Sequence, residues 1–183
     1  LHEHQHSFPT RRSSDLLDFA RDMFLFSFYT RGMSFVDMSY LRRKDLSNGI
    51  LTYRRHKTGQ LLHIKWEACM QEIVNKYKNE QSTFLLPIIN TDDVEEQRKQ
   101  YIYSAHNINR CLKKIGAMLG LSLPLTMYVA RHTWASIAKQ KNIPISIISD
   151  GLGHDSELTT RIYLSSLDNI EIDKANKMIM RLL

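Results

Sequence analysis

The sequence contains little cysteine, no long apolar run and no repeated segment. Its 183 residues include only Cys69 and Cys111, and both fall in expected helices. Two thiols are too few for the disulfide framework of a small secreted protein, and free thiols fit a reducing cytoplasm. No apolar run reaches the roughly 18 residues that a membrane-spanning helix needs. There is also no internal repeat and no low-complexity tract, which excludes a repeat array.

The composition is that of one globular domain. Hydrophobic residues make up 43% of the chain and charged residues 24%, a balance that supports a hydrophobic core rather than a disordered chain. A length of 183 residues is enough for one such domain. The formal net charge of +6 favours an anionic partner, with nucleic acid as the first candidate.

The first sixteen residues do not read like the rest of the chain. Three histidines alternate with other residues at His2, His4 and His6, and residues 7–16 look like the translation of a common sequencing-library adapter. A metal-binding tail, a basic DNA-binding arm and plain disorder are the alternatives. We expect residues 1–16 to be a non-native, disordered leader and exclude them from the fold. The chain also lacks an initiator methionine, which indicates a truncated protein.

Apolar periodicity in the remaining chain predicts helices and one hairpin. Two strand-like runs, residues 50–53 and 61–65, flank a turn at Lys57-Thr58-Gly59 and predict an antiparallel hairpin. Residues 84–89 are expected to form an extended segment or loop. The expected fold is mainly α with a small antiparallel β-sheet (α+β). Helices are predicted over residues 18–30, 35–41, 66–79, 95–119 and 131–141, then from about Pro144, and last over 168–181.

The most informative stretch is residues 125–164. Arg131 opens an apolar helix, a Leu152-Gly153-His154 turn follows, and Tyr163 stands nine positions after the histidine. Each has an ordinary explanation by itself, as a surface ion pair, a helix C-cap or a packed aromatic ring. Together, the residue types suit chemistry on a phosphodiester. A planar cation binds phosphate oxygens, an imidazole donates or exchanges protons, and a phenol attacks phosphorus.

This order of residues resembles the tyrosine recombinase (phage integrase) family, in which a His-x-x-Arg motif precedes Leu-Gly-His and the nucleophilic tyrosine. The resemblance covers residues 17–183. It implies the family's catalytic-domain fold and an integrase of the mobile-element kind. Such an enzyme cuts and rejoins DNA through a 3′-phosphotyrosyl intermediate, with no metal and no other cofactor. The alternatives are a non-catalytic DNA-binding relative and a type IB topoisomerase-like nicking-closing enzyme.

The resemblance also implies a partner and a setting. The partner is double-stranded DNA, on which the full-length protein is expected to form a homo-tetramer across synapsed sites. The expected location is the cytoplasm, in association with the nucleoid. The family's N-terminal DNA-clamping domain is not found in this sequence, so residues 17–183 are expected to be the catalytic domain of a longer protein.

Four residues take their expected roles from the family's motifs. Tyr163 is the nucleophile, and Arg131 and His154 contact the scissile phosphate. Lys57, in the hairpin turn, matches the family's lysine, which protonates the leaving 5′ oxygen. A mobile loop suits a general acid that engages only when DNA is bound.

Two neighbours of Arg131 need separate treatment. Tyr128 stands three residues before it, where the family usually has histidine. A tyrosine there can hydrogen-bond the phosphate but is a weak base at neutral pH. His132 follows the arginine directly and is expected to point away from the site, in packing or as a cap.

The family's first arginine has no clear counterpart. Arg31 is the only arginine in the corresponding stretch and is the preferred candidate. If Asp37 matches the family's acidic residue, however, the arginine's place falls on Ser34. In that case Arg54 or Arg55 of the hairpin would supply the missing charge.

Overall fold

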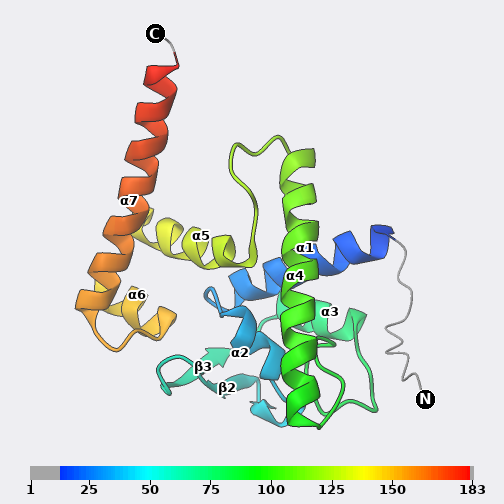
Figure 1. The fold of residues 1–183 in the computed structure, drawn as a ribbon. Helices are drawn as coiled ribbons and strands as arrows, with labels where there is room; N and C mark the ends of the chain where they lie inside the picture. The colour runs from blue at the N-terminus through cyan, green and yellow to red at the C-terminus, as the bar shows by residue number, and fades with distance from the viewer. Residues whose placement is uncertain (1–12, 182–183) are drawn as a thin grey trace.

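The computed structural model describes residues 13–181, without the side chains of residues 13, 168–171, 174 and 175. It is mainly helical with one small antiparallel sheet (Figure 1), which confirms the expected fold class. None of the helices in this range is long and apolar enough to span a bilayer. The elements in chain order are α1 (Ser13–Tyr29), α2 (Phe35–Tyr40), the 3-10 helix η1 (Arg43–Asp45), β1 (Leu46–Ser47), β2 (Ile50–Arg54), β3 (Leu61–Lys65), α3 (Ala68–Lys76), α4 (Val94–Met118), α5 (Met127–Gln140), α6 (Ile145–Leu152) and α7 (Glu157–Met180).

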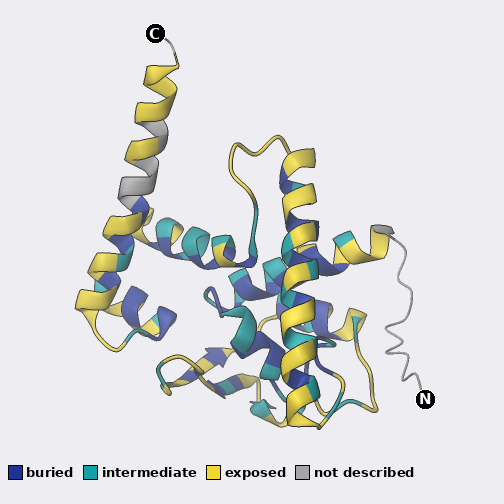
Figure 2. Ribbon diagram, viewed as in Figure 1, coloured by how far each residue is buried: buried dark blue, intermediate teal, exposed yellow. Residues whose placement is uncertain are grey.

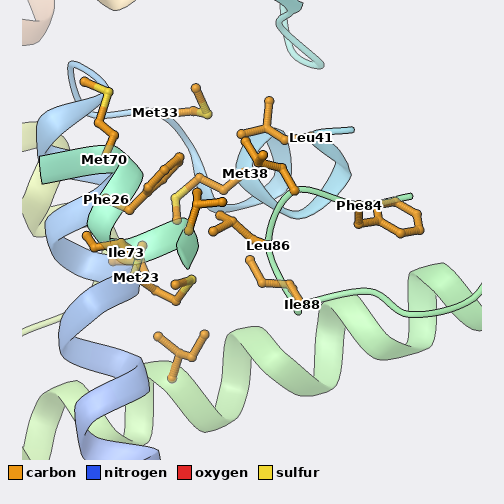
Figure 3. Close-up of a cluster of buried hydrophobic side chains, with 14 of the residues drawn as sticks. Met23, Phe26, Met33, Met38, Leu41, Met70, Ile73, Phe84, Leu86 and Ile88 are labelled. Carbon is orange, nitrogen blue, oxygen red and sulfur yellow. The ribbon is translucent and has the colours of Figure 1, made fainter. Parts of the chain in front are cut away.

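The larger hydrophobic core surrounds α1. Met23 and Phe26 of this helix are fully buried, and they lie with Met38 of α2, Met70 of α3 and Leu86 in one cluster (Figure 3). Burying a side chain of this size contributes about 1.5–3 kcal/mol. The long helix α4 crosses α1 and turns its exposed side to solvent (Figure 2). Because α1 is packed on both sides, the position of the loop that follows it is fixed.

The hairpin is built by strict alternation. Strands β1, β2 and β3 pair in that order, all antiparallel, and Leu51 pairs with Ile64 and Tyr53 with Leu62. These four side chains are buried, whereas Ile50 and Leu61 at the ends of the pairing are exposed. Since successive strand residues face opposite sides of a sheet, one face covers the core and the other meets solvent. The loop after β2 therefore starts at a defined place.

A second, smaller core joins α5, α6 and α7. It contains Ala135, Ile148, Leu152, Leu164 and other buried residues of these three helices. Helix α7 leaves this core and extends past the other elements to the C-terminus (Figure 1). Arg131, the Leu152-Gly153-His154 turn and Tyr163 lie on these three helices and the turns between them.

Three expected boundaries were wrong. Helix α5 begins at Met127, so Arg131 lies in its second turn rather than at its start. The last helix begins at Glu157, not near residue 168, because the Ser156 hydroxyl caps it by accepting from the Thr159 amide. Helix α1 starts at Ser13, inside the range expected to be a disordered leader; residues 1–12 lie outside the described part.

Candidate active site

Arg131 is held on the buried side of α5 by carbonyl oxygens. The residue is only 7% exposed. Nη1 donates to the carbonyl oxygen of Gly32 at 3.0 Å, and Nη2 donates to that of Leu152 at 2.6 Å. The chain at Gly32 lies so close that a Cβ there would be 2.6 Å from the Cα of Arg131. The guanidinium is therefore fixed in the interior and is not part of a surface ion pair.

The turn after α6 presents His154 to Arg131. Gly153 has φ 63° and closes the helix in the left-handed conformation, which glycine adopts at little cost. Nε2 of His154 lies 3.1 Å from Nη2 of Arg131, and Nδ1 lies 2.9 Å from Oγ1 of the fully buried Thr160. Because a guanidinium can only donate, Nε2 is the acceptor of that bond. The proton of the neutral ring is therefore on Nδ1, which donates to Thr160.

His154 is uncharged at physiological pH. Burial, together with the positive charges of Arg131, Arg55 and Lys57, lowers its pKa from 6.5 to about 4. The imidazole consequently contributes hydrogen bonding to the site rather than another positive charge.

Arg55 brings a second buried cation to the same place. It directly follows β2, is 7% exposed, and donates from Nη1 to the carbonyl oxygen of Gly153. Burial and the charge of Arg55 together lower the pKa of Arg131, so the two guanidinium groups repel each other. Within residues 13–181, the two groups donate to carbonyl oxygens and one imidazole and never to a carboxylate. Two buried cations without an anionic partner are unfavourable, and an anion that contacts both would relieve the cost.

Tyr163 lies beside these groups in the second turn of α7. Its ring meets that of His154 edge-on, with centroids 5.5 Å apart. Burial raises the pKa of Tyr163, as do the charge of Tyr128 and a hydrogen bond with that residue, while the charge of Arg131 acts in the opposite direction. The phenol is thus protonated at neutral pH, close to the cation that would stabilise its ionised form.

His132 does not point away from the site, so that expectation was wrong. Its Nδ1 lies 2.9 Å from the hydroxyl oxygen of Tyr163, and the two rings are nearly parallel, at 9° with centroids 5.4 Å apart. Successive helix residues diverge by about 100°, which is why the sequence suggested that Arg131 and His132 serve different regions. Helix α7 packs against α5, and this packing places Tyr163 on the side of α5 that carries His132.

The remaining candidates lie around this centre. Lys57 is exposed in the hairpin loop, and its charge contributes to the low pKa of His154. Tyr128 is 58% exposed, and its ring meets the His132 ring edge-on at 4.2 Å. Burial raises the pKa of Tyr53, an effect that Arg131, Arg55 and Arg31 partly offset. The three arginines thus act on one buried phenol.

Arg31 and Ser34 have distinct settings. Arg31 follows α1 with φ 63° and is half-buried; in the described part of the chain no hydrogen bond joins its side chain to Arg131, His154 or Tyr163. Ser34 caps α2: its hydroxyl donates to Oδ2 of Asp37 at 2.6 Å and accepts from the Asp37 amide. A serine in this position has a structural use of its own.

Asp37 has a role that the sequence did not reveal. It is 4% exposed, and its Oδ1 accepts from the backbone amide of His56 at 2.8 Å and lies 3.2 Å from the ring Nδ1 of His56. The carboxylate therefore ties the hairpin loop, between Arg55 and Lys57, to α2. Thr160 was likewise missed as the partner of His154; its place in the first turn of α7, after the Ser156 cap, was the available signal. Among the described residues, no group of three or more His, Cys, Asp or Glu side chains is arranged to hold a metal ion.

Comparison with known proteins gives one family. The model of the phage integrase family matches residues 27–169 of this chain. A tyrosine recombinase of Pseudothermotoga lettingae is 33% identical over 70 residues, which are 38% of this chain and 24% of that protein. A tyrosine recombinase of Agathobacter rectalis is 23% identical over 138 residues, which are 74% of this chain and 44% of that protein. The chain thus spans less than half the length of either relative.

Solved structures share the fold. A lambda integrase dimer bound to a COC′ core site has a TM-score of 0.57 at 18% identity, covering 80% of this chain and 52% of that one. XerA recombinase has a TM-score of 0.57 at 18% identity, covering 88% of this chain and 61% of that one. At this identity the likeness concerns the arrangement of the helices and the sheet.

Proposed function

Because this chain belongs to the phage integrase family, we propose that it carries the catalytic site of a site-specific DNA recombinase. The reaction breaks and rejoins DNA strands through a 3′-phosphotyrosyl intermediate on Tyr163. The observation that carries this proposal is the pair of buried guanidinium groups, Arg131 and Arg55, which have no carboxylate partner among the described residues and lie with His154 beside Tyr163.

The two arginines would bind the scissile phosphate. Of the five N–H groups of Arg131, three are used: one by Gly32, one by Leu152 and one by His154. One Nη1 hydrogen and the Nε hydrogen remain for a phosphate oxygen. Fixed donors aimed at the charge that develops on the non-bridging oxygens are the largest source of catalysis in such sites.

His154 would respond to the phosphate by exchanging tautomers. Its Nε2 accepts from Arg131 in the free protein, so it cannot donate to a phosphate in that state. The hydroxyl of Thr160 can either accept from Nδ1 or donate to it. When a phosphate oxygen replaces Nε2 of His154 as the acceptor of the Arg131 Nη2 hydrogen, the Nε2–H tautomer of His154 becomes available. That tautomer donates to a phosphate oxygen.

Arg55 is our assignment for the first clamp position, in preference to Arg31. Three observations support it: Arg55 is buried, it shares the Leu152-Gly153-His154 turn with Arg131, and its charge acts directly on Arg131. Arg31 is the second candidate, on the strength of its place in the sequence. Lys57, in the exposed loop beside Arg55, is proposed to protonate the leaving 5′ oxygen, and Tyr128 to hydrogen-bond at the edge of the site.

The partner follows from this chemistry. We propose double-stranded DNA, bound partly through the excess positive charge of the chain. Within the full-length protein, residues 17–183 would be the catalytic domain, and four protomers would act on two synapsed sites. The reaction would take place on chromosomal and mobile-element DNA in the cytoplasm, at the nucleoid.

A trapping experiment tests the proposal. The chain is incubated with nicked duplexes of randomised sequence. Cleavage next to the nick releases a short fragment that carries the 5′ hydroxyl, and this fragment diffuses away so that rejoining fails. Wild-type protein should form complexes that survive SDS, and sequencing their DNA would reveal the preferred site. Tyr163→Phe should bind the same DNA without covalent attachment. Phosphotyrosyl formation by that variant would refute the assignment. On intact DNA that carries the preferred site, cleavage and rejoining without any strand exchange would indicate a nicking-closing enzyme.

A further inference from the structure

We propose that His132 is a catalytic residue: it accepts the phenolic proton of Tyr163 during DNA cleavage and returns it during rejoining. This inference rests on the proposed function and names the proton acceptor for its nucleophile. The family's histidine three residues before the arginine is replaced here by Tyr128, which leaves the site without a base at that position.

The geometry already matches proton transfer. The hydroxyl oxygen of Tyr163 and Nδ1 of His132 are 2.9 Å apart, a normal distance for a hydrogen bond between a base and the proton it removes. The imidazole packs against two rings, nearly parallel to that of Tyr163 and edge-on to that of Tyr128. His132 touches the reacting atom itself.

The protonation states also agree. Burial, and then the charge of Arg131, lower the pKa of His132 below 6.5, so the ring is neutral near pH 7. In its Nε2–H tautomer the Nδ1 lone pair accepts from the phenol. The titratable or charged groups around it are Tyr128 and Arg131 on α5, Tyr163 on α7, and His154 in the turn between α6 and α7. A bound phosphate would neutralise Arg131, which removes one of the two causes of the low pKa and strengthens the base.

The other nearby groups are less suited to this task. Both ring nitrogens of His154 are occupied, by Arg131 and by Thr160. Tyr128 is itself a phenol, and a neutral phenol is a poor proton acceptor. His132 is the neutral imidazole that hydrogen-bonds the Tyr163 hydroxyl.

The proton count closes with the groups present. In cleavage the bond from the Tyr163 oxygen to phosphorus forms and the bond from phosphorus to the 5′ oxygen breaks. The phenolic proton passes to Nδ1 of His132, and Lys57 supplies a proton to the leaving oxygen. In rejoining, the 5′ hydroxyl returns its proton to Lys57 and attacks phosphorus, and the departing phenolate recovers its proton from His132.

The test uses the full chain and single-turnover trapping on nicked DNA. His132→Ala and His132→Asn should both slow formation of the covalent complex by about 100-fold or more, the usual range for general-base catalysis. The asparagine can keep a hydrogen bond to Tyr163 but cannot take its proton. Added imidazole should restore part of the rate of His132→Ala. His63→Ala, at an exposed histidine on β3, is the matched control and should retain the wild-type rate.

A modified substrate separates the base from the acid. With a 5′-bridging phosphorothiolate, the leaving sulfur needs no proton, so Lys57→Ala should recover while His132→Ala should not. A His132→Asn rate within a few-fold of wild type would show that His132 only positions the phenol, and faster cleavage by His132→Ala would show that it restrains a resting state. Either result overturns this inference while leaving the proposed function intact. Failure of the wild-type protein to form any covalent complex would instead refute the function.

Discussion

A methyl group at Gly32 should disturb both the stability of this protein and its active site. Gly32 has φ 72°, and a Cβ built there would lie 2.6 Å from Cα of Arg131 and 2.9 Å from its Cβ and Cγ. A residue with a Cβ pays about 1–2 kcal/mol to adopt left-handed backbone, and overfilling a packed site costs typically about 1–3 kcal/mol more. Gly32→Ala should therefore lower the free energy of unfolding by about 2–5 kcal/mol.

Gly49 offers a matched control. It has the same φ of 72°, but nothing lies within 4 Å of a Cβ built on it. Gly49→Ala should thus carry only the backbone cost, about 1–2 kcal/mol. Urea unfolding followed by circular dichroism measures both variants under the same conditions.

The two variants should also differ in function. The methyl group at Gly32 pushes on α5 at the residue whose guanidinium donates to the Gly32 carbonyl oxygen, so covalent trapping by Gly32→Ala should fall even in the folded fraction. Gly49→Ala should cleave normally once folded. Equal losses of stability in the two variants, or wild-type trapping by Gly32→Ala, would refute the claim that contact with this glycine sets the position of Arg131.

Three further predictions concern the charges of the site. Arg55→Ala should reduce covalent trapping by about 100-fold or more, the scale for removal of one fixed transition-state donor. Trapping by Arg54→Ala, at an exposed neighbour that donates to Gly59, should stay within a few-fold of wild type. A severe loss in Arg31→Ala with a mild one in Arg55→Ala would reverse our assignment. The pKa of His154 is about 4 in the folded protein and near 6.5 when unfolded. The unfolded chain therefore binds more protons between these pH values, and the free energy of unfolding should decrease as the pH falls through them. Urea titrations at several pH values should show a weaker pH dependence of this free energy for His154→Gln, and an unchanged dependence would contradict the low pKa. DNA binding should weaken steeply with salt, because phosphate contacts release counterions, and trapping should persist in EDTA; loss of trapping in EDTA with recovery on adding a divalent ion would contradict the phosphotyrosyl mechanism.

The sequence by itself determined the fold class and the order of the candidate catalytic motifs. The alternation in the hairpin, the apolar stripes of the helices and the left-handed turn at Gly153 are local properties, governed by residues a few positions apart. The spacing of Arg131, Leu152-Gly153-His154 and Tyr163 is local in the same sense, because α5, α6 and α7 follow one another with short turns. The early start of α7 was also encoded locally, in the cap at Ser156, although apolar periodicity alone did not locate it.

Only the tertiary structure decided which side chains meet. Arg55 reaches the carbonyl oxygen of Gly153, 98 residues away, and Arg131 reaches that of Gly32, 99 residues away. Periodicity along a chain carries no information about such pairs, because the packing of α1, the hairpin and α5 around shared cores sets their distance. The contact between His132 and Tyr163 has the same origin. Helix α5 contacts the end of α6 through Arg131 and contacts α7 through the next residue, His132.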